Sequence, residues 1–528
     1  MTPAATNSIV RNICAVRTKH PGALALGVLS IGVALLVGVG LTSAQAAGKP
    51  AGGPTVTAAL ASLQRSGAIA PATYQQDSSA YTTAERSLKK LSGTRHVELG
   101  AVLANVRAIA AAGEFSPSRL PALFLTLERN RTWWTTGSLL AAKVRVSFPG
   151  SELVWEYYPG QGIEIQWLGT FGEGNGYYLA GNENANLKQL VSEIVPLATA
   201  RAGGIAWEYM FQFDGGKPPW TSGLSQATAL QVLARAGSRF KEPADLTAAQ
   251  QALGIFKTPS PAGVRVTSAL GAHYLEYTYA PADRILNGEI QALVGLYDYT
   301  SITQDPVGLK LFEEGDAEER VRTPLFNTGG WSMYDQHGES DLSYHELLTE
   351  FLQHLCERTR KGEPLAAAPA PAPAPAPTPT TPTTTTPTTG GTGGASAARY
   401  TAQAASTTAP ATAIPGDAIY CTTAEAFTAD LHTPPAIALL TSKLPTSARA
   451  GVQLSLSKVA TVHLTVRNSA GKIVWSNTAT VEHGKPKLLW PTPAKGGIYA
   501  VTLTATDLAG NSATASGTIT VAKGAKAH

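Results

Sequence analysis

The chain has 528 residues, of which 44% are hydrophobic and 15% are charged, and its formal net charge is +4 at pH 7. This apolar content excludes a wholly disordered chain, and the length favours roughly two to four domains. No dense run of lysine and arginine accompanies the mild positive charge, so the sequence does not indicate a nucleic acid partner.

The first 46 residues have the pattern of a secretory signal. Basic residues precede an uncharged apolar run from Gly22 to Leu41, and Ala44-Gln45-Ala46 follows it. This order predicts a signal peptide over residues 1–46, cleaved after Ala46. The apolar run is also just long enough to span a bilayer, so retention as a membrane anchor is the alternative. A cleaved signal peptide and a retained anchor both predict an exported protein, either secreted or at the cell surface. The protein would contact the membrane only if the segment is retained.

Two segments of different periodicity follow. Apolar residues recur at three- and four-residue steps between Val97 and Ile109, which helps to predict an N-terminal helical region over residues 55–140. Alternation begins at Lys143 and resumes after the turn at Pro149, which predicts a small antiparallel β-rich element over residues 141–182. We expect residues 172–178, which are rich in glycine, to be a flexible loop.

Helical periodicity returns over residues 183–362. Six helices are predicted, near residues 185–201, 222–238, 244–256, 287–302, 307–321 and 342–358. Loops rich in glycine and aromatic residues separate them. Paired helices joined by such loops favour an α/α-barrel, or toroid, with its chemistry on the loop side.

The C-terminal part changes composition twice. Residues 363–432 are rich in proline, threonine and alanine and predict an extended linker. Residues 433–523 alternate in short strands separated by turns, which favours an immunoglobulin-like β-sandwich that serves as a spacer or stabiliser. The predicted fold class is therefore multidomain α+β, with a helical α/α-barrel, a small antiparallel β element, a Pro/Thr linker and a C-terminal sandwich.

Cysteine is scarce, with Cys14, Cys356 and Cys421 as the complete set. Three cysteines without a Cys-x-x-Cys motif exclude a disulfide framework and do not indicate a zinc site. Cys356 and Cys421 lie in different predicted segments. We expect free or partly buried thiols, with a bridge between them in an oxidising compartment as the alternative.

Polar and aromatic side chains gather in the loops of residues 183–362. The run His273–Pro281 holds three tyrosines and a glutamate, and Trp331–Asp335 and Ser343–His345 add further tyrosines and a histidine. Packing usually explains a single tyrosine, but this set, with its glutamate, asparagine and histidine, indicates a candidate catalytic site. Nucleotide-driven and metalloprotease chemistry lack support because the chain has no P-loop and no His-Glu-x-x-His motif.

Several short motifs follow one another in an order that one enzyme family shares. They are Ile285–Gly288, Gly295–Asp298, Leu311–Gly315, Trp331–Asp335 and Tyr344-His345, with Tyr157–Gly162 and Pro219-Trp220 upstream. Over about residues 144–360 this series resembles the C-terminal domain of the D-glucuronyl C5-epimerases.

The resemblance implies a β-rich element followed by an α/α-barrel, with the active site in the cleft between them. It implies an isomerase that inverts C5 of a uronic acid unit, so the expected partner is a uronic-acid-containing polysaccharide. The reaction requires no redox cofactor. The metal that related enzymes suggest is a structural calcium ion in the β-rich element.

Matched one position at a time, the family's motifs imply two sets of site residues. The catalytic set is Glu276, Tyr277, Tyr334 and Tyr344. The substrate-binding set is Asn287, His337, His345 and Trp220. We expect Tyr344 and either Glu276 or Tyr277 to be the opposed acid and base. In the alternative, Glu276 only complements the dipole of the helix that follows it.

Two positions depart from the family's pattern. His337 stands where heparan-type epimerases have an arginine that can grip a carboxylate, and Glu289 stands where an apolar aromatic residue is common. Histidine is a weaker and pH-dependent clamp. These departures put a heparan-like substrate in question more than they do the type of reaction.

Three other functions compete with epimerisation. A polysaccharide lyase shares the abstraction of the C5 proton and then expels the C4 oxygen. A glycoside hydrolase needs a second carboxylate beside Glu276, for which Asp335 and Asp341 are candidates. The third alternative is an exported carbohydrate-binding protein without catalytic activity, whose aromatic loops stack on sugars.

Overall fold

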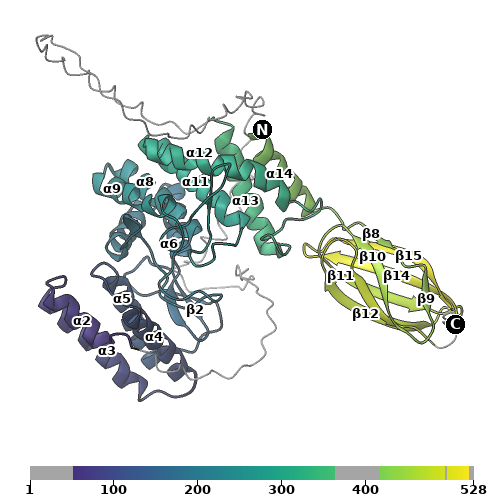
Figure 1. Ribbon diagram of the computed structural model, residues 1–528, viewed down its shortest axis with the longest axis horizontal. Helices are drawn as coiled ribbons and strands as arrows, with labels where there is room; N and C mark the ends of the chain where they lie inside the picture. Colours follow the sequence, from purple (N-terminus) through teal and green to yellow (C-terminus); the bar gives the residue numbers. More distant parts are fainter. Residues whose placement is uncertain (1–51, 363–416, 494–495, 523–528) are drawn as a thin grey trace, which may run out of the picture.

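The computed structural model describes residues 52–362, 417–493 and 496–522 (Figure 1). They form a body of helices and small sheets and a C-terminal β-domain that extends from one side of it. The mixed α+β class is confirmed. The predicted signal peptide and residues 363–416 of the predicted linker lie outside the described residues. Within the described ranges, no helix is both long and apolar enough to cross a membrane.

Four helices occupy the N-terminal region: α2 Val56–Arg65, α3 Pro71–Leu88, α4 Gly93–Ala111 and α5 Leu120–Thr136. The apolar steps of α4, including Val102 and Ile109, are buried between these helices. Glu98 on the same helix accepts hydrogen bonds from the Tyr157 hydroxyl at 2.9 Å and the Gly162 amide at 3.1 Å. The N-terminal helices therefore hold the sheet that follows them.

That sheet is antiparallel, in the order β1 Arg145–Val146, β2 Trp155–Tyr158 and β3 Gly162–Ile165. The next element is helix α6 Trp167–Ala180, so residues 172–178 are helical and not the loop that their glycines suggested. A Cβ atom at Gly174 would lie 2.9 Å from Cγ1 of Val232. The glycine therefore allows α6 to pack closely on a neighbouring helix.

The rest of the body contains helices and two short hairpins. The helices are α7 Asn184–Ile194, η1 Val195–Leu197, α8 Gly223–Phe240, α9 Pro243–Ala252, α10 Gly254–Lys257, α11 Leu286–Thr303, α12 Pro306–Arg322, η2 Thr323–Phe326 and α13 Leu342–Thr359. The hairpins pair β4 Thr199–Arg201 with β5 Gly204–Ala206 and β6 Arg265–Thr267 with β7 Ala272–Tyr274. Helices α8 and α11 are buried along most of their length and pack against each other.

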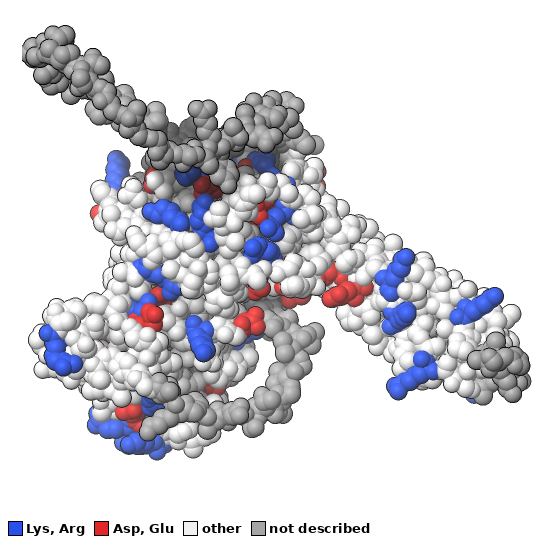
Figure 2. Space-filling model, viewed as in Figure 1, with Lys and Arg blue, Asp and Glu red and all other residues white. Residues whose placement is uncertain are grey.

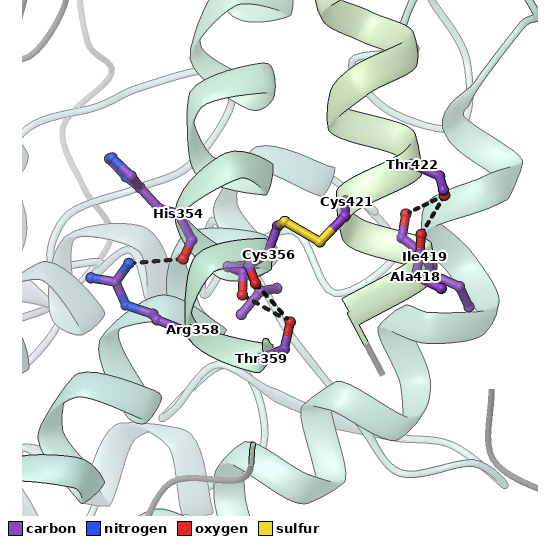
Figure 3. The surroundings of a disulfide bond; sticks show 9 residues. His354, Cys356, Arg358, Thr359, Ala418, Ile419, Cys421 and Thr422 are labelled. Atoms are coloured by element: carbon purple, nitrogen blue, oxygen red, sulfur yellow. Dashed lines mark hydrogen bonds between the residues drawn. A yellow bond between two sulfur atoms is a disulfide. The ribbon is translucent and has the colours of Figure 1, made fainter. Parts of the chain in front are cut away.

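A further helix, α14 Asp417–Asp430, packs on α13, so the end of the predicted linker is ordered as part of the body. Cys356 of α13 and Cys421 of α14 form a disulfide (Figure 3). The expectation of free thiols is therefore corrected. The two residues lie in different segments of the sequence, but the docking of α14 places their Cα atoms 4.9 Å apart.

The C-terminal β-domain contains two sheets. The strands are β8 Ile437–Leu439, β9 Lys443–Pro445, β10 Arg449–Leu456, β11 Ala460–Arg467, β12 Ile473–Val481, β13 Lys487–Pro491, β14 Gly497–Asp507 and β15 Ser512–Ala522. One sheet has the order β13-β10-β8 and the other β12-β11-β14-β15-β9. Inward residues of both sheets, among them Leu454, Leu464 and Leu503, share one apolar core. Figure 2 shows Lys and Arg side chains scattered over the visible face, on the body and on the β-domain.

Candidate active site

Glu276 lies between strand β7 and helix α11, in contact with two helix N-termini. Its Oε1 accepts a hydrogen bond of 3.1 Å from the hydroxyl of Ser222, the residue that caps α8. Its Oε2 is buried and has no hydrogen-bond partner among the described residues. A Cβ atom at Gly288 would lie 2.3 Å from this Oε2, so the glycine after Asn287 lets the carboxylate approach the first turn of α11.

Burial raises the pKa of Glu276 to about 7, and the hydrogen bond from Ser222 acts in the opposite direction. A buried carboxylate loses hydration in its charged form, which explains the upward shift. A carboxyl group that titrates near neutral pH can both accept and return a proton. The position at α11 also suits the alternative role of complementing the helix dipole, but that role does not require an unpartnered oxygen.

Tyr277 belongs to a wall of aromatic rings beside this carboxylate. Its ring stacks on Tyr279 with centroids 5.3 Å apart and meets the edge of Trp220 at 5.7 Å. Trp220 itself is 4% exposed, and its indole N–H donates to the carbonyl of Phe211 at 2.8 Å. Trp220 is therefore a buried support of this wall, and its predicted contact with substrate stays a prediction.

Tyr334 and Tyr344 approach the same place from another part of the chain. Their ring centroids lie 4.6 Å apart. Tyr344 is on the first turn of α13, where its backbone N–H donates to the capping carboxylate of Asp341 at 2.8 Å. Tyr334 is fixed by a tight turn, in which its N–H donates to the carbonyl of Gly338 at 2.8 Å. The cap and the turn thus present the two phenol groups together.

The three tyrosines and Glu276 interact electrostatically. Burial raises the pKa of Tyr277, Tyr334 and Tyr344, and the nearby charge of Glu276 raises all three further. Their hydroxyl groups are therefore protonated at neutral pH and are suited to donate protons, whereas Glu276 is the member suited to accept one. The structure brings together all four residues of the predicted catalytic set.

The predicted substrate-binding residues are more dispersed. Asn287 is 5% exposed and precedes Gly288 on the first turn of α11. His337 is exposed in the same turn as Tyr334, with its backbone N–H bonded to Asp335. Both are near the catalytic set in the fold.

His345 faces the interior. Its ring is 0% exposed and stacks on Trp331 with centroids 3.8 Å apart. One ring nitrogen lies 2.8 Å from the Ser332 hydroxyl and the other 3.0 Å from the carbonyl of Phe427 in α14. The expectation that His345 binds substrate is corrected: neighbouring positions on a helix point about 100° apart, so Tyr344 and His345 cannot share a face.

Ser222, which donates to Glu276, was not among the predicted site residues, and neither were two tyrosines that interact electrostatically with this group. Burial raises the pKa of Tyr158, at the end of β2, and the charge of Glu156 and the phenol of Tyr209 raise it further. Burial raises the pKa of Tyr209 as well, and the charge of Glu276 adds to that shift. Strand alternation could have identified Tyr158, because Tyr157 is buried on the opposite face of the sheet.

Lys143 provides a cation between the β-rich element and the helices. Burial lowers its pKa, and the negative charges of Glu156 and Asp341 oppose that shift. Glu156 belongs to β2, whereas Asp341 caps the helix that carries Tyr344. A lysine influenced by both carboxylates lies where an anion bound beside Tyr344 would meet a positive charge.

The turn that carries Tyr334 also contacts the β-domain. Glu339, at the end of this turn, accepts backbone hydrogen bonds from Val459 at 3.1 Å and His483 at 2.9 Å. The Lys458 ammonium lies 5.3 Å from the ring centroid of Trp331. The β-domain is therefore joined to the loop that positions one of the candidate catalytic tyrosines.

One group in the described part of the chain has the composition of a metal site. It consists of His273, Glu289 and Glu319, whose ligand atoms lie within 4.8 Å of one another. Burial lowers the pKa of His273 to about 3, so its ring is neutral and its contacts with the two glutamates are not ion pairs. The calcium ion expected in the β-rich element stays a prediction.

Comparison with known proteins places this site in a recognised domain. Residues 202–365 match the family model described as the D-glucuronyl C5-epimerase C-terminus. A D-glucuronyl C5-epimerase of Caenorhabditis elegans is 30% identical over 131 residues, which are 22% of this chain and 21% of that protein. An uncharacterized protein of Methanocaldococcus jannaschii is 28% identical over 151 residues, 27% of this chain and 49% of that protein.

The chain thus spans about a fifth and about half of the length of these two curated relatives. The resemblance inferred from the motifs is confirmed over residues 202–365, which match the family's C-terminal domain. The upstream motif Tyr157–Gly162 lies outside the matched segment. All four residues of the predicted catalytic set lie inside the matched segment. Tyr158 and Lys143 lie before it.

Proposed function

We propose that the protein is a polysaccharide uronate C5-epimerase, which removes and returns the proton at C5 of a uronic acid unit. The observation that carries this proposal is the group of Glu276 with Tyr277, Tyr334 and Tyr344 inside the family's domain. It combines a carboxyl group that titrates near neutral pH with phenols that stay protonated. The match covers only 21% of the Caenorhabditis elegans epimerase, so the activity of that whole protein is a proposal for this chain.

The chemistry requires a base and an acid around a stabilised carbanion. Removal of the C5 proton puts negative charge onto the adjacent carboxylate, which forms an enediolate-like intermediate. Glu276 is the proposed base, because its Oε2 is unpartnered and its pKa of about 7 allows ionisation at neutral pH. Tyr344 is the proposed acid, since its raised pKa keeps a proton on the hydroxyl.

The substrate carboxylate must also be neutralised. His337, whose side chain is exposed, stands where heparan-type epimerases have an arginine that can grip a carboxylate. Lys143 is the proposed replacement, because it lies within the electrostatic reach of Glu156 and of the Asp341 cap beside Tyr344. Hydrogen-bond donors aimed at the developing charge contribute strongly in such sites, and the phenol of Tyr334 is the proposed donor.

The hydrolase alternative is less well supported by the carboxylates. Asp335 accepts backbone hydrogen bonds from His337 and Gly338, and Asp341 accepts one from Tyr344. Both act as caps of local structure, so neither provides the second free carboxylate that glycoside hydrolysis needs. A lyase keeps the same proton abstraction and differs only in what the intermediate expels.

Several broader expectations belong to the same proposal. The substrate is a uronic-acid-containing polysaccharide, the protein acts after export, and the reaction needs no redox cofactor. The helices of the body form an α/α-barrel, and the C-terminal β-domain is an immunoglobulin-like spacer or stabiliser. The two sheets of the β-domain support the immunoglobulin-like arrangement. The hydrogen bond from Val459 to Glu339 supports a stabilising role.

The test is incubation of the intact chain in deuterated water with a panel of uronate-containing polysaccharides, heparosan among them. Nuclear magnetic resonance should show deuterium at C5 in a product of unchanged chain length. An unsaturated uronate at a new chain end would establish the lyase instead, and new reducing ends without unsaturation would establish the hydrolase. Binding without exchange on any polysaccharide of the panel would favour the non-catalytic alternative.

A further inference from the structure

Behind the candidate site, three side chains from three elements converge in the interior. His273 comes from strand β7, Glu289 from the first turn of α11 and Glu319 from α12. Nδ1 of His273 lies 3.2 Å from Oε1 of Glu319 and 3.4 Å from Oε2 of Glu289. The side chains of both glutamates are 0% exposed and that of the histidine is 3% exposed.

Some polar atoms of this group are paired and others are not: Nδ1 of His273 is within hydrogen-bond distance of Oε1 of Glu319, and Oε2 of Glu289 accepts from the N–H of Tyr274. Three further atoms are buried and have no hydrogen-bond partner in the described part of the chain: Oε1 of Glu289, Oε2 of Glu319 and Nε2 of His273. Buried carboxylates that lack partners are expensive, because they give up hydration without compensation. Each glutamate therefore keeps one oxygen without a partner among the described residues, whereas the atoms that face one another are Nδ1 of His273, Oε1 of Glu319 and Oε2 of Glu289.

The neighbouring arginines do not meet this need. Arg322 directs its Nε to Glu318, and Arg284 donates from one guanidinium nitrogen to the carbonyls of Pro281 and Asp283. The backbone N–H of Tyr274 reaches Oε2 of Glu289, which leaves Oε1 of that carboxylate open. Two carboxyl groups thus lie against one imidazole, and none of the described lysine or arginine side chains forms an ion pair with them.

The spacing suits a small divalent ion. Nitrogen and oxygen ligands about 2.0–2.1 Å from a tetrahedral ion are about 3.3–3.4 Å from one another. The two measured separations, 3.2 and 3.4 Å, agree with that edge length. One imidazole with two carboxyl groups is a ligand set typical of Zn²⁺ or Mn²⁺, and a divalent cation would balance the charge of the two glutamates in their ionised form.

We propose that His273, Glu289 and Glu319 bind one divalent transition-metal ion, of which Zn²⁺ and Mn²⁺ are the fitting examples. The ion joins β7, α11 and α12. His273 is three residues before Glu276, and Glu289 is two residues after Asn287, so the ion holds the two segments that carry these site residues. The role is structural. The proposal does not depend on which reaction the neighbouring site performs.

The first test is metal content. The intact chain is stripped with a chelator, reloaded with Zn²⁺, Mn²⁺ or Co²⁺, dialysed and analysed by mass spectrometry for bound metal. We expect about one equivalent per chain. The Co²⁺-loaded chain should show visible absorption bands of a low-symmetry site, and the melting temperature should fall on stripping and recover on reloading.

The matched variants are Glu319→Gln and Glu314→Gln, because both positions are on α12 and only Glu319 faces the triad. Glu319→Gln should lose the metal and the Co²⁺ bands, whereas Glu314→Gln should keep both. If Glu319→Gln fails to fold, Glu289→Gln and the stripping of the unmodified chain supply the same readout. Less than a tenth of an equivalent on the reloaded chain, with no effect of any of the three ions on melting, would overturn the proposal.

Discussion

The segment from His273 to Glu289 supplies ionisable groups to two different surroundings. Glu276 accepts a hydrogen bond from a serine hydroxyl and raises the pKa of three tyrosines, and its own pKa rises to about 7. Glu289 meets a second glutamate and an imidazole in the closed interior. The difference teaches that burial of a carboxyl group does not by itself indicate catalysis. The tyrosines near Glu276 can donate protons, which indicates a reaction. The glutamate and imidazole beside Glu289 are possible metal ligands, which indicates an ion.

The largest expected effect that would sharpen this comparison is on activity. Tyr344→Phe removes the proposed proton donor and should slow exchange at C5 by about 10²–10⁴-fold, the usual contribution of a positioned acid. The fold should persist, because the ring still packs on Tyr334 at a centroid distance of 4.6 Å. Exchange rate and melting temperature are measured together.

A matched control is Tyr81→Phe, since Tyr81 is a buried tyrosine in α3, within the N-terminal helices. It should keep full exchange activity. Equal losses in Tyr81→Phe and Tyr344→Phe would mean that packing, and not proton transfer, explains the tyrosines.

The next largest effect concerns the base. The exchange rate should rise with pH as the Glu276 carboxyl ionises, with a midpoint near its pKa of about 7. Glu276→Gln should abolish this dependence and lower the rate by about 10²-fold or more. A pH profile that is unchanged in Glu276→Gln would remove Glu276 from the base role.

The ionisation of Glu276 affects stability in the opposite direction: as the pH rises, the exchange rate should increase and the free energy of unfolding should decrease. The pKa of Glu276 is raised from 4.5 to about 7 in the folded chain, so between these values the folded state binds more protons than the unfolded state. The stabilising contribution of this group is full below pH 4.5 and is lost as the pH rises through 7. Denaturant unfolding of Glu276→Gln should show a weaker decline over that window. An identical decline would contradict the burial of this carboxyl group.

Sequence patterns could predict the elements whose periodicity is strong and the residues that follow family motifs. The helical stretch around Val102 and the alternation of the C-terminal strands are confirmed in this way, and the structure brings together the predicted set from Glu276 to Tyr344. The patterns failed where tertiary packing decides. Glycines at positions 172–178 resemble a loop, yet Gly174 is what allows helix α6 to contact Val232.

Sequence patterns also did not predict the direction in which individual side chains point. Sequence position could not distinguish Tyr344 from His345, because only the helix rotation sends one ring to the site and the other between Trp331 and Phe427. The disulfide was missed for a similar reason. A bridge across 65 residues depends on the docking of α14, which no local pattern of the chain reveals.

A smaller effect is expected at that disulfide. The double substitution Cys356→Ser with Cys421→Ser should lower the free energy of unfolding by about 2–4 kcal/mol, mainly because the unfolded chain gains freedom. The double variant should also become insensitive to reductant, whereas the unmodified chain should lose stability when reduced. Equal denaturation midpoints for reduced and oxidised protein would show that α14 is held by packing alone.

The smallest expected effect concerns the junction with the β-domain. Glu339→Gln weakens two backbone hydrogen bonds to a carboxylate and should cost about 1–3 kcal/mol of docking. Amide hydrogen exchange should increase at Val459 and His483, with a several-fold lower activity through the Tyr334 turn. Glu482→Gln is the control, since that residue is exposed beside the same contact. Unchanged exchange at both amides would show that the junction does not depend on Glu339.

The most direct test of the central claim, that this glutamate and these tyrosines move the C5 proton, is one exchange measurement. The intact chain and its Tyr344→Phe and Glu276→Gln variants are incubated in deuterated water with the panel polysaccharide that binds best, and C5 is observed by magnetic resonance. We predict deuterium at C5 with intact chains for the unmodified protein and a severe loss for both variants. Exchange that survives in both variants, with their folds preserved, would contradict the assignment of this site.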